Sequence, residues 1–152
     1  MIPFKRILWP TDFSEPSFEA LEAAIELTAA FCSELYLLHV IPPIPVANEA
    51  EGPTSFDVSL YQAELEKSAK KMMEGLREKK ISKEIRVHQM ISHGHPAPEI
   101  SRIAEDKHID LIVIATHGET GWKHFIFGSV AEKVMRHASL PVLVIHAPRE
   151  KK

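Results

Sequence analysis

Five short apolar runs, separated by helical patterns, most constrain the fold of this 152-residue chain. They are residues 6–9, 34–40, 85–91, 110–115 and 141–145. The second, fourth and fifth runs are almost continuously apolar, which is typical of parallel strands covered on both faces. The third run alternates apolar and polar side chains, which favours a more exposed strand at a sheet edge.

Apolar side chains recur at three- and four-residue steps between these runs and predict four amphipathic helices. Pro16 lies just inside the first helix, where a missing N–H costs little, and Pro96 and Pro98 open the third. The side chains expected on the buried helix faces are Phe18, Leu21, Ile25, Thr28 and Cys32, then Val58, Tyr61, Leu65, Met72 and Leu76, then Ile100, Ile103 and Ala104, and finally Val130, Ala131, Val134 and Ala138.

This strand–helix alternation predicts an α/β fold with a three-layer, doubly wound, mostly parallel sheet and right-handed crossovers. We expect residues 1–152 to form a single domain, as their number suits. Residues 41–57 are proline-rich and aperiodic, and they predict a mobile loop after the second strand. That loop is either a lid over a ligand site or an ordinary surface loop.

Composition excludes several classes of partner. The net charge of −3 gives no electrostatic reason to expect binding to nucleic acid or to an anionic membrane. Cys32 is the single cysteine and cannot form an internal disulfide, which fits a reducing cytosol. The first ten residues are too charged for a signal peptide, and no apolar run is long enough to span a membrane. We therefore expect a cytoplasmic protein.

The first candidate site segment follows the first strand. Ligands of open parallel sheets bind at the carboxyl ends of the strands, where the strand order reverses. Pro10, Thr11 and Asp12 stand at such a point, and an acidic residue there commonly accepts hydrogen bonds from ribose hydroxyls. The alternative is structural, because Asp12 or Ser14 could simply cap the first helix.

The second candidate segment follows the fourth strand and runs through Ala115, His117 and Gly118 to Gly128 and Ser129. Gly118 lets the backbone approach a ligand closely, and the free N–H groups at the start of the fourth helix form an anion site. Ser129 adds a hydroxyl donor, and protonation of His117 would tune phosphate binding near neutral pH. The alternative is a glycine turn followed by an ordinary serine helix cap.

The sequence lacks the motifs of several other kinds of binding or catalytic site. The chain has no P-loop, no G-x-G-x-x-G after the first strand, no nucleophile elbow, no H-E-x-x-H and no cysteine cluster. His93 and His95 could supply half of a metal site, but the sequence does not identify the other ligands, and exposed imidazoles are the simpler interpretation.

Three pieces of the chain together resemble the universal stress protein family. They are residues 7–14 (ILWPTDFS), residues 38–40 (LHV), and residues 114–118 (IATHG) continued by 128–134 (GSVAEKV) and 140–144 (LPVLV). ATP-binding members share a motif of Gly, two residues, Gly, nine residues, Gly, then Ser or Thr. This chain has Ala115 in the first glycine position, which leaves room for the ligand provided that φ at Ala115 is negative.

The resemblance implies a Rossmann-like sheet of the adenine nucleotide alpha hydrolase type, with strand order 3-2-1-4-5. It implies that the chain binds ATP with Mg or Mn. It assigns the ribose to Asp12, the adenine edge to the backbone near Val40, the pocket lining to Pro10 and Thr11, the walls to Ile114 and Ala115, and the phosphates to Gly118, Gly128, Ser129 and Val130. It also implies a homodimer paired through residues 141–146, whose bare apolar edge pairing would remove.

The function expected is that of an ATP-binding stress-response or signalling protein whose nucleotide state biases an unknown protein partner. Lys123, His117 and His124 are in no recognised catalytic arrangement, so we expect at most slow hydrolysis. Two alternatives remain: a dimeric interaction module of the same fold that binds no nucleotide, and a nucleotide-processing enzyme.

Overall fold

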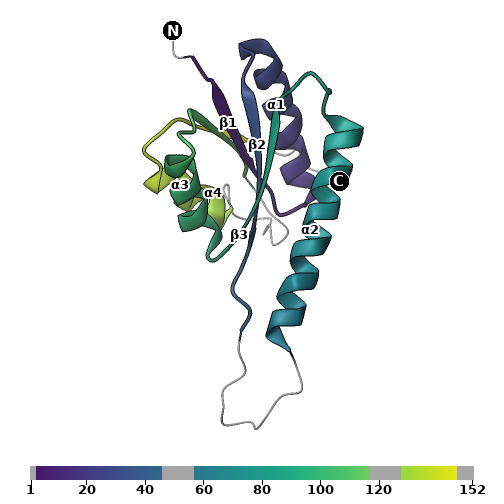
Figure 1. The fold of residues 1–152 in the computed structure, drawn as a ribbon. Helices are drawn as coiled ribbons and strands as arrows, with labels where there is room; N and C mark the ends of the chain where they lie inside the picture. Colours follow the sequence, from purple (N-terminus) through teal and green to yellow (C-terminus); the bar gives the residue numbers. More distant parts are fainter. Residues whose placement is uncertain (1–2, 46–56, 117–127, 147–152) are drawn as a thin grey trace, which may run out of the picture.

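The computed structural model describes residues 3–45, 57–116 and 128–146, which form a parallel sheet flanked by helices (Figure 1). The strands are β1 (Arg6–Pro10), β2 (Glu34–Ile41), β3 (Val87–His93), β4 (Leu111–Ala115) and β5 (Val142–Ile145). The helices are α1 (Glu15–Phe31), α2 (Val58–Lys80), α3 (Pro96–Asp106) and α4 (Ser129–His137). The strand order is β3-β2-β1-β4-β5 and every pair is parallel, which confirms the predicted fold class and order.

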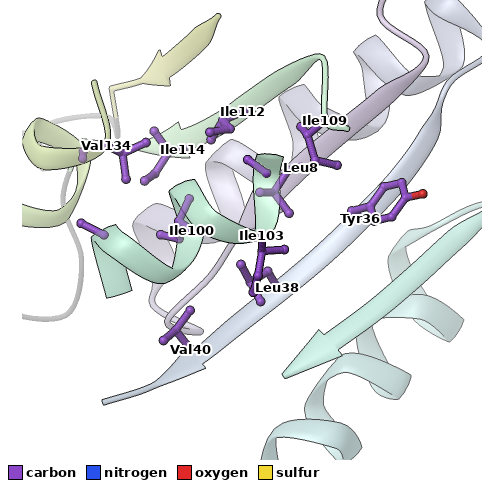
Figure 2. Close-up of a cluster of buried hydrophobic side chains, with 13 residues drawn as sticks. Leu8, Tyr36, Leu38, Val40, Ile100, Ile103, Ile109, Ile112, Ile114 and Val134 are labelled. Carbon is purple, nitrogen blue, oxygen red and sulfur yellow. The ribbon is translucent and has the colours of Figure 1, made fainter. Parts of the chain in front are cut away.

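Strand alternation divides the core into two clusters, one on each face of the sheet. Leu8, Leu38 and Ile112 point to the face covered by α3 and α4, and Figure 2 shows this cluster. Ile7, Leu37 and Val113 point to the face covered by α1 and α2. In Figure 1 the two helix pairs lie on opposite sides of the sheet, as a doubly wound fold requires.

The third strand begins and ends two residues later than predicted. Residues 85–91 were expected, but β3 spans Val87–His93. Ile85 belongs instead to the turn after α2, because its N–H donates to the Ser82 carbonyl. Arg77 fixes that turn by donating to the carbonyls of Ile81, Ser82 and Ile85. At its other end β3 continues to His93, which pairs with Ile41. The predicted edge position of this strand is confirmed.

In the two longest helices, some residues expected on the buried face are exposed. Cys32 ends α1 in a left-handed conformation and is exposed, so its predicted core position is wrong. In α2 the buried residues are Ala69 and Met73, whereas Tyr61 and Met72 are exposed. The predicted faces of α3 and α4 are confirmed, since Ile100, Ile103, Ala104, Ala131 and Val134 are all buried.

The fifth strand is less covered than its apolar sequence predicts. Within the described ranges β5 pairs only with β4, and none of its residues is fully buried. Leu143 is 37% exposed and belongs to neither core cluster. Val142 and Val144 pack against one core cluster and Ile145 against the other, so both faces of this apolar edge strand are covered in part.

The predicted loop at 41–57 is shorter at both ends. Ile41 is the last residue of β2 and is buried, and Asp57 caps α2 by accepting from the N–H groups of Ser59 and Leu60. Residues 46–56 lie outside the described residues. In the ranges that the structure describes, none of the helices combines the length and the apolarity needed to cross a bilayer.

Candidate functional site at the carboxyl ends of β1 and β4

The strand order reverses between β1 and β4. The chain leaves β1 through α1 toward β2, and it enters β4 from α3, which crosses the opposite face. The two strands pair directly, Ile7 with Leu111 and Leu8 with Ile112. Their carboxyl ends are therefore neighbours from which the connections diverge, and the predicted site residues on both strands meet at this point.

The turn between β1 and α1 is held by the side chain of Thr11. Its hydroxyl accepts from the Phe13 N–H at 2.8 Å and is hydrogen-bonded to the Ser17 hydroxyl at 2.8 Å. Phe13 has a φ of +62°, a conformation that non-glycine residues adopt rarely and that must be stabilised by its surroundings. Thr11 is buried and its polar groups are engaged, so it holds the turn rather than offering a hydrogen bond to a ligand.

His39, for which the sequence predicts no role, also supports this turn. Its Nδ1–H donates to the Thr11 carbonyl at 2.8 Å, which requires that the proton be on Nδ1. Its ring lies 4.6 Å from the ring of Phe13, centroid to centroid. The histidine of the LHV segment therefore links β2 to the β1–α1 turn.

The sequence left open whether Asp12 or Ser14 caps α1, and the structure assigns the cap to Ser14. Ser14 is the N-cap of α1 and accepts from the Ser17 N–H. Asp12 accepts from the Ser14 N–H at 3.0 Å through Oδ1. Asp12 is exposed at the end of β1, so its carboxylate is accessible to a ligand while it braces the cap.

The apolar wall of the site lies on the α3–α4 face. Val40 and Ile114 belong to the core cluster on that face, and alternation places Pro10 there beside Leu8. Ala115 belongs to the opposite cluster, so Ile114 and Ala115 do not form one wall with their side chains. Ala115 is part of extended β4 and is not among the residues with positive φ, as the predicted substitution for glycine requires.

The amino end of α4 faces the end of β4. Gly128 is the N-cap of α4, and its N–H donates to the Thr116 carbonyl. Glycine has no side chain with which to cap a helix, and the N–H groups of Ser129 and Val130 have no acceptor within α4. This confirms that Gly128 and Ser129 open the helix. His117 and Gly118 lie outside the described residues.

The turn from β3 into α3 is organised by Glu99. Its carboxylate accepts from Arg102 Nε at 3.0 Å and Nη2 at 2.9 Å, and from the Ser92 hydroxyl. The hydrogen bonds from Arg102 and then Ser92 hold the pKa of Glu99 at about 2, although burial opposes them. The stabilisation is therefore complete above pH 4.5 and is lost as the pH falls toward 2. This turn is structural.

The two histidines considered as metal ligands have other surroundings. His93 pairs through Nε2 with the Glu66 carboxylate on α2. His95 is the N-cap of α3 and makes no capping hydrogen bond with its side chain. Among the described residues there is no group of three or more His, Cys, Asp or Glu side chains arranged to hold a metal.

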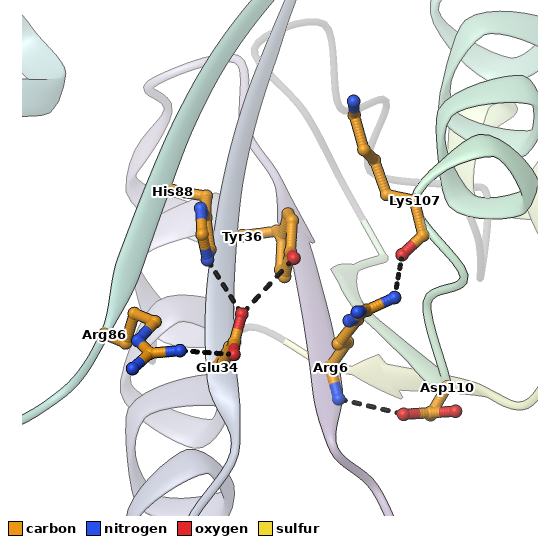
Figure 3. A network of polar contacts seen from close by, with 7 residues as sticks. All are labelled: Arg6, Glu34, Tyr36, Arg86, His88, Lys107 and Asp110. Atoms are coloured by element: carbon orange, nitrogen blue, oxygen red, sulfur yellow. Dashed lines mark hydrogen bonds and ion pairs between the residues drawn. The ribbon is translucent and has the colours of Figure 1, made fainter.

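A second polar network lies at the amino ends of the strands (Figure 3). Glu34 accepts from His88 at 2.8 Å and from Arg86 at 3.0 Å, and the His88 hydrogen bond is the main cause of its lowered pKa. Asp110 accepts from the backbone N–H groups of Lys5 and Arg6. These contacts join neighbouring elements at the amino ends of the strands, whereas the candidate site lies at the carboxyl ends. We therefore assign them no role in ligand binding.

Comparison with known proteins identifies the family. The model of the universal stress protein family matches residues 3–146. The chain belongs to the universal stress protein family. Among its relatives is universal stress protein MJ0531 of Methanocaldococcus jannaschii, which is 37% identical over 150 residues that cover 97% of this chain and 85% of that protein.

Solved structures agree with this family assignment. The structure of MJ0577, a protein of Methanocaldococcus jannaschii, superposes with a TM-score of 0.83 at 33% identity, covering 98% of this chain and 100% of that one. A universal stress protein in complex with cAMP superposes with a TM-score of 0.67 at 18% identity, covering 96% of this chain and 99% of that one. At that identity the second likeness concerns the fold alone.

Proposed function

We propose that this universal stress protein binds an adenine nucleotide, ATP with Mg²⁺ or Mn²⁺, at the carboxyl ends of β1 and β4. The observation that carries the proposal is the convergence of an exposed carboxylate, Asp12, and an open helix amino end, Gly128–Ser129, at the switch point of the sheet. A carboxylate suits ribose hydroxyls, and free N–H groups with a helix dipole suit phosphates.

The surroundings support a base between these two polar ends. Pro10, Val40 and Ile114 are buried apolar residues on the α3–α4 face at the carboxyl ends of β1, β2 and β4, and we assign the base to this end of that face. Ser129 and Val130 contribute N–H donors, and we assign Gly118 to the phosphates from its spacing in the family motif. A relative of this fold holds cAMP, which shows that the fold accommodates an adenine nucleotide in at least one protein.

The donor set fits a metal carried by the nucleotide rather than by the protein. Around the α4 amino end the groups are N–H and hydroxyl donors, which attract phosphate oxygens and not cations. A divalent ion would neutralise the triphosphate. The residues that we considered for phosphoryl transfer lie in 117–127, outside the described residues, and we propose at most slow hydrolysis, with the nucleotide state biasing a protein partner in the cytoplasm.

Calorimetric titration with Mg-ATP tests the site. We expect nucleotide-free wild-type protein to bind, and Asp12→Ala to bind about tenfold or more weakly because hydrogen bonds to a charged group are lost. Asp12→Asn keeps one acceptor oxygen and should lie between them. Asp106→Ala removes an exposed carboxylate at the far end of α3 and should leave the affinity unchanged.

A further variant separates ligand contact from damage to the turn. Ser14→Ala removes the α1 cap but keeps the Asp12 carboxylate, so its affinity should stay near that of the wild type. If Ser14→Ala and Asp12→Ala weaken binding equally, the role of Asp12 is structural. If the wild type binds no adenine nucleotide, the proposal fails and the interaction module remains; Ala115 in the glycine position of the motif favours that module.

We also propose that residues 1–152 act as one domain that dimerises through residues 141–146. The half-exposed apolar strand β5 supports this, because such an edge favours pairing with another strand. We expect Leu143→Lys to shift the protein from a dimer to a 17.1 kDa monomer in sedimentation velocity. Leu60→Lys is the control, since Leu60 is 65% exposed on α2. A wild-type monomer would contradict the proposal.

A further inference from the structure

Thr116 contains a polar group that the protein leaves unsatisfied. It follows the last residue of β4, and its N–H donates to the Ile145 carbonyl at 3.0 Å. Its carbonyl accepts from the Gly128 N–H. The residue is 1% exposed, and within the described ranges its Oγ1 is the buried side-chain polar atom that lacks a hydrogen-bond partner.

The other buried hydroxyls show how unusual this is. Thr11 and Ser17 bond to each other, Thr28 donates to the Ala24 carbonyl at 2.7 Å, and Ser33 donates to the Phe4 carbonyl. Burying a hydroxyl without a partner costs about 1–3 kcal/mol. An unsatisfied group of this kind needs an explanation, and a hydrogen bond made on ligand binding is one.

The position of Thr116 suggests what that ligand is. Ile112 and Ile114 point to the α3–α4 face, and alternation places the Thr116 side chain on the same face, where α4 lies. The Gly128–Thr116 hydrogen bond joins this residue directly to the N-cap of α4. The nine-residue helix presents N–H donors and the positive end of its dipole at this point.

We propose that the Thr116 hydroxyl donates a hydrogen bond to a phosphate oxygen of the nucleotide bound at the amino end of α4. This inference rests on the proposed function and adds to it a side chain that the family motif does not include. In the free protein the hydroxyl is buried without a partner, and the phosphate supplies one. Part of the binding energy therefore comes from satisfying a group that destabilises the empty protein.

The isosteric change Thr116→Val makes the two halves of this proposal separately measurable. Valine removes the hydroxyl and keeps the shape, so the nucleotide-free variant should be more stable, with a Tm raised by about 2–4 °C. Its affinity for Mg-ATP should fall about tenfold or more. Its affinity for adenosine, which has no phosphate, should be unchanged, and Thr116→Ser should bind Mg-ATP as the wild type does.

Thr28→Val is the matched control. Thr28 is as buried as Thr116, but its hydroxyl has a partner within α1, in the last turn of the helix and away from the Asp12 turn at its start. That variant should be slightly less stable than the wild type, and it should bind Mg-ATP normally.

The outcomes separate this inference from the proposed function. A wild type that binds no Mg-ATP overturns both. A wild type that binds, together with a Thr116→Val variant of equal Mg-ATP affinity, overturns the hydroxyl contact alone. A loss of stability in free Thr116→Val also overturns it, because the hydroxyl would then have a partner inside the protein.

Discussion

Replacing Trp9 with alanine will lower the free energy of unfolding by about 3–5 kcal/mol, as expected for truncating a buried aromatic side chain. Trp9 is fully buried in β1, in the cluster beneath α1 and α2. Its indole Nε1–H donates to the Ser17 carbonyl at 2.8 Å, and its ring lies 6.4 Å from that of Phe18. The residue thus fastens the first turn of α1 to β1, which ends at Pro10, two residues before Asp12.

Urea unfolding followed by far-ultraviolet circular dichroism measures this effect, because the change removes a tryptophan fluorophore. Trp9→Phe is the control: it keeps an aromatic ring in the core and loses the indole hydrogen bond, so its cost should be smaller, about 1–2 kcal/mol. A loss below 1 kcal/mol for Trp9→Ala would mean that the cavity collapses or that the side chain is not packed as described.

The fold was predictable because its signals are local. The apolar run of β4, Leu111–Ala115, and the prolines at the start of α3 identify their elements without knowledge of their neighbours. The start of β3 was not predictable in this way. It depends on Arg77, whose guanidinium reaches from α2 to the carbonyls of the following turn, and no periodicity in residues 85–91 encodes that contact.

Some residues of the candidate site could likewise be predicted from the sequence and others could not. The positions of Asp12 after β1 and of Gly128 and Ser129 at the start of α4 were predictable from residue type and from the strands that precede them, whereas their contacts with a nucleotide stay a prediction. Thr116 and His39 were missed, since their roles follow from burial and from which backbone group each one meets. The opposite directions of Ile114 and Ala115 follow from strand alternation, which the family assignment of both as walls did not take into account.

Replacing Gly94 with alanine should be the next most costly change, at about 2–4 kcal/mol. Gly94 lies in the turn between β3 and α3 with a φ of +137°, a conformation that side chains rarely allow. A Cβ built there would lie 3.0 Å from Cγ of Glu99, the residue that holds the start of α3. The Gly94 N–H also donates to the Ile41 carbonyl at the end of β2.

A double-mutant cycle separates the two causes. In a Glu99→Ala background the contact with Cγ is gone, so the cost of Gly94→Ala should fall to the backbone part, about 1–3 kcal/mol. Gly75→Ala is the control in α2, where an added Cβ meets nothing within 4 Å, and it should stabilise the protein by up to about 1 kcal/mol. Equal costs of Gly94→Ala in both backgrounds would assign the whole effect to the backbone and leave Glu99 no part in excluding a side chain from this turn.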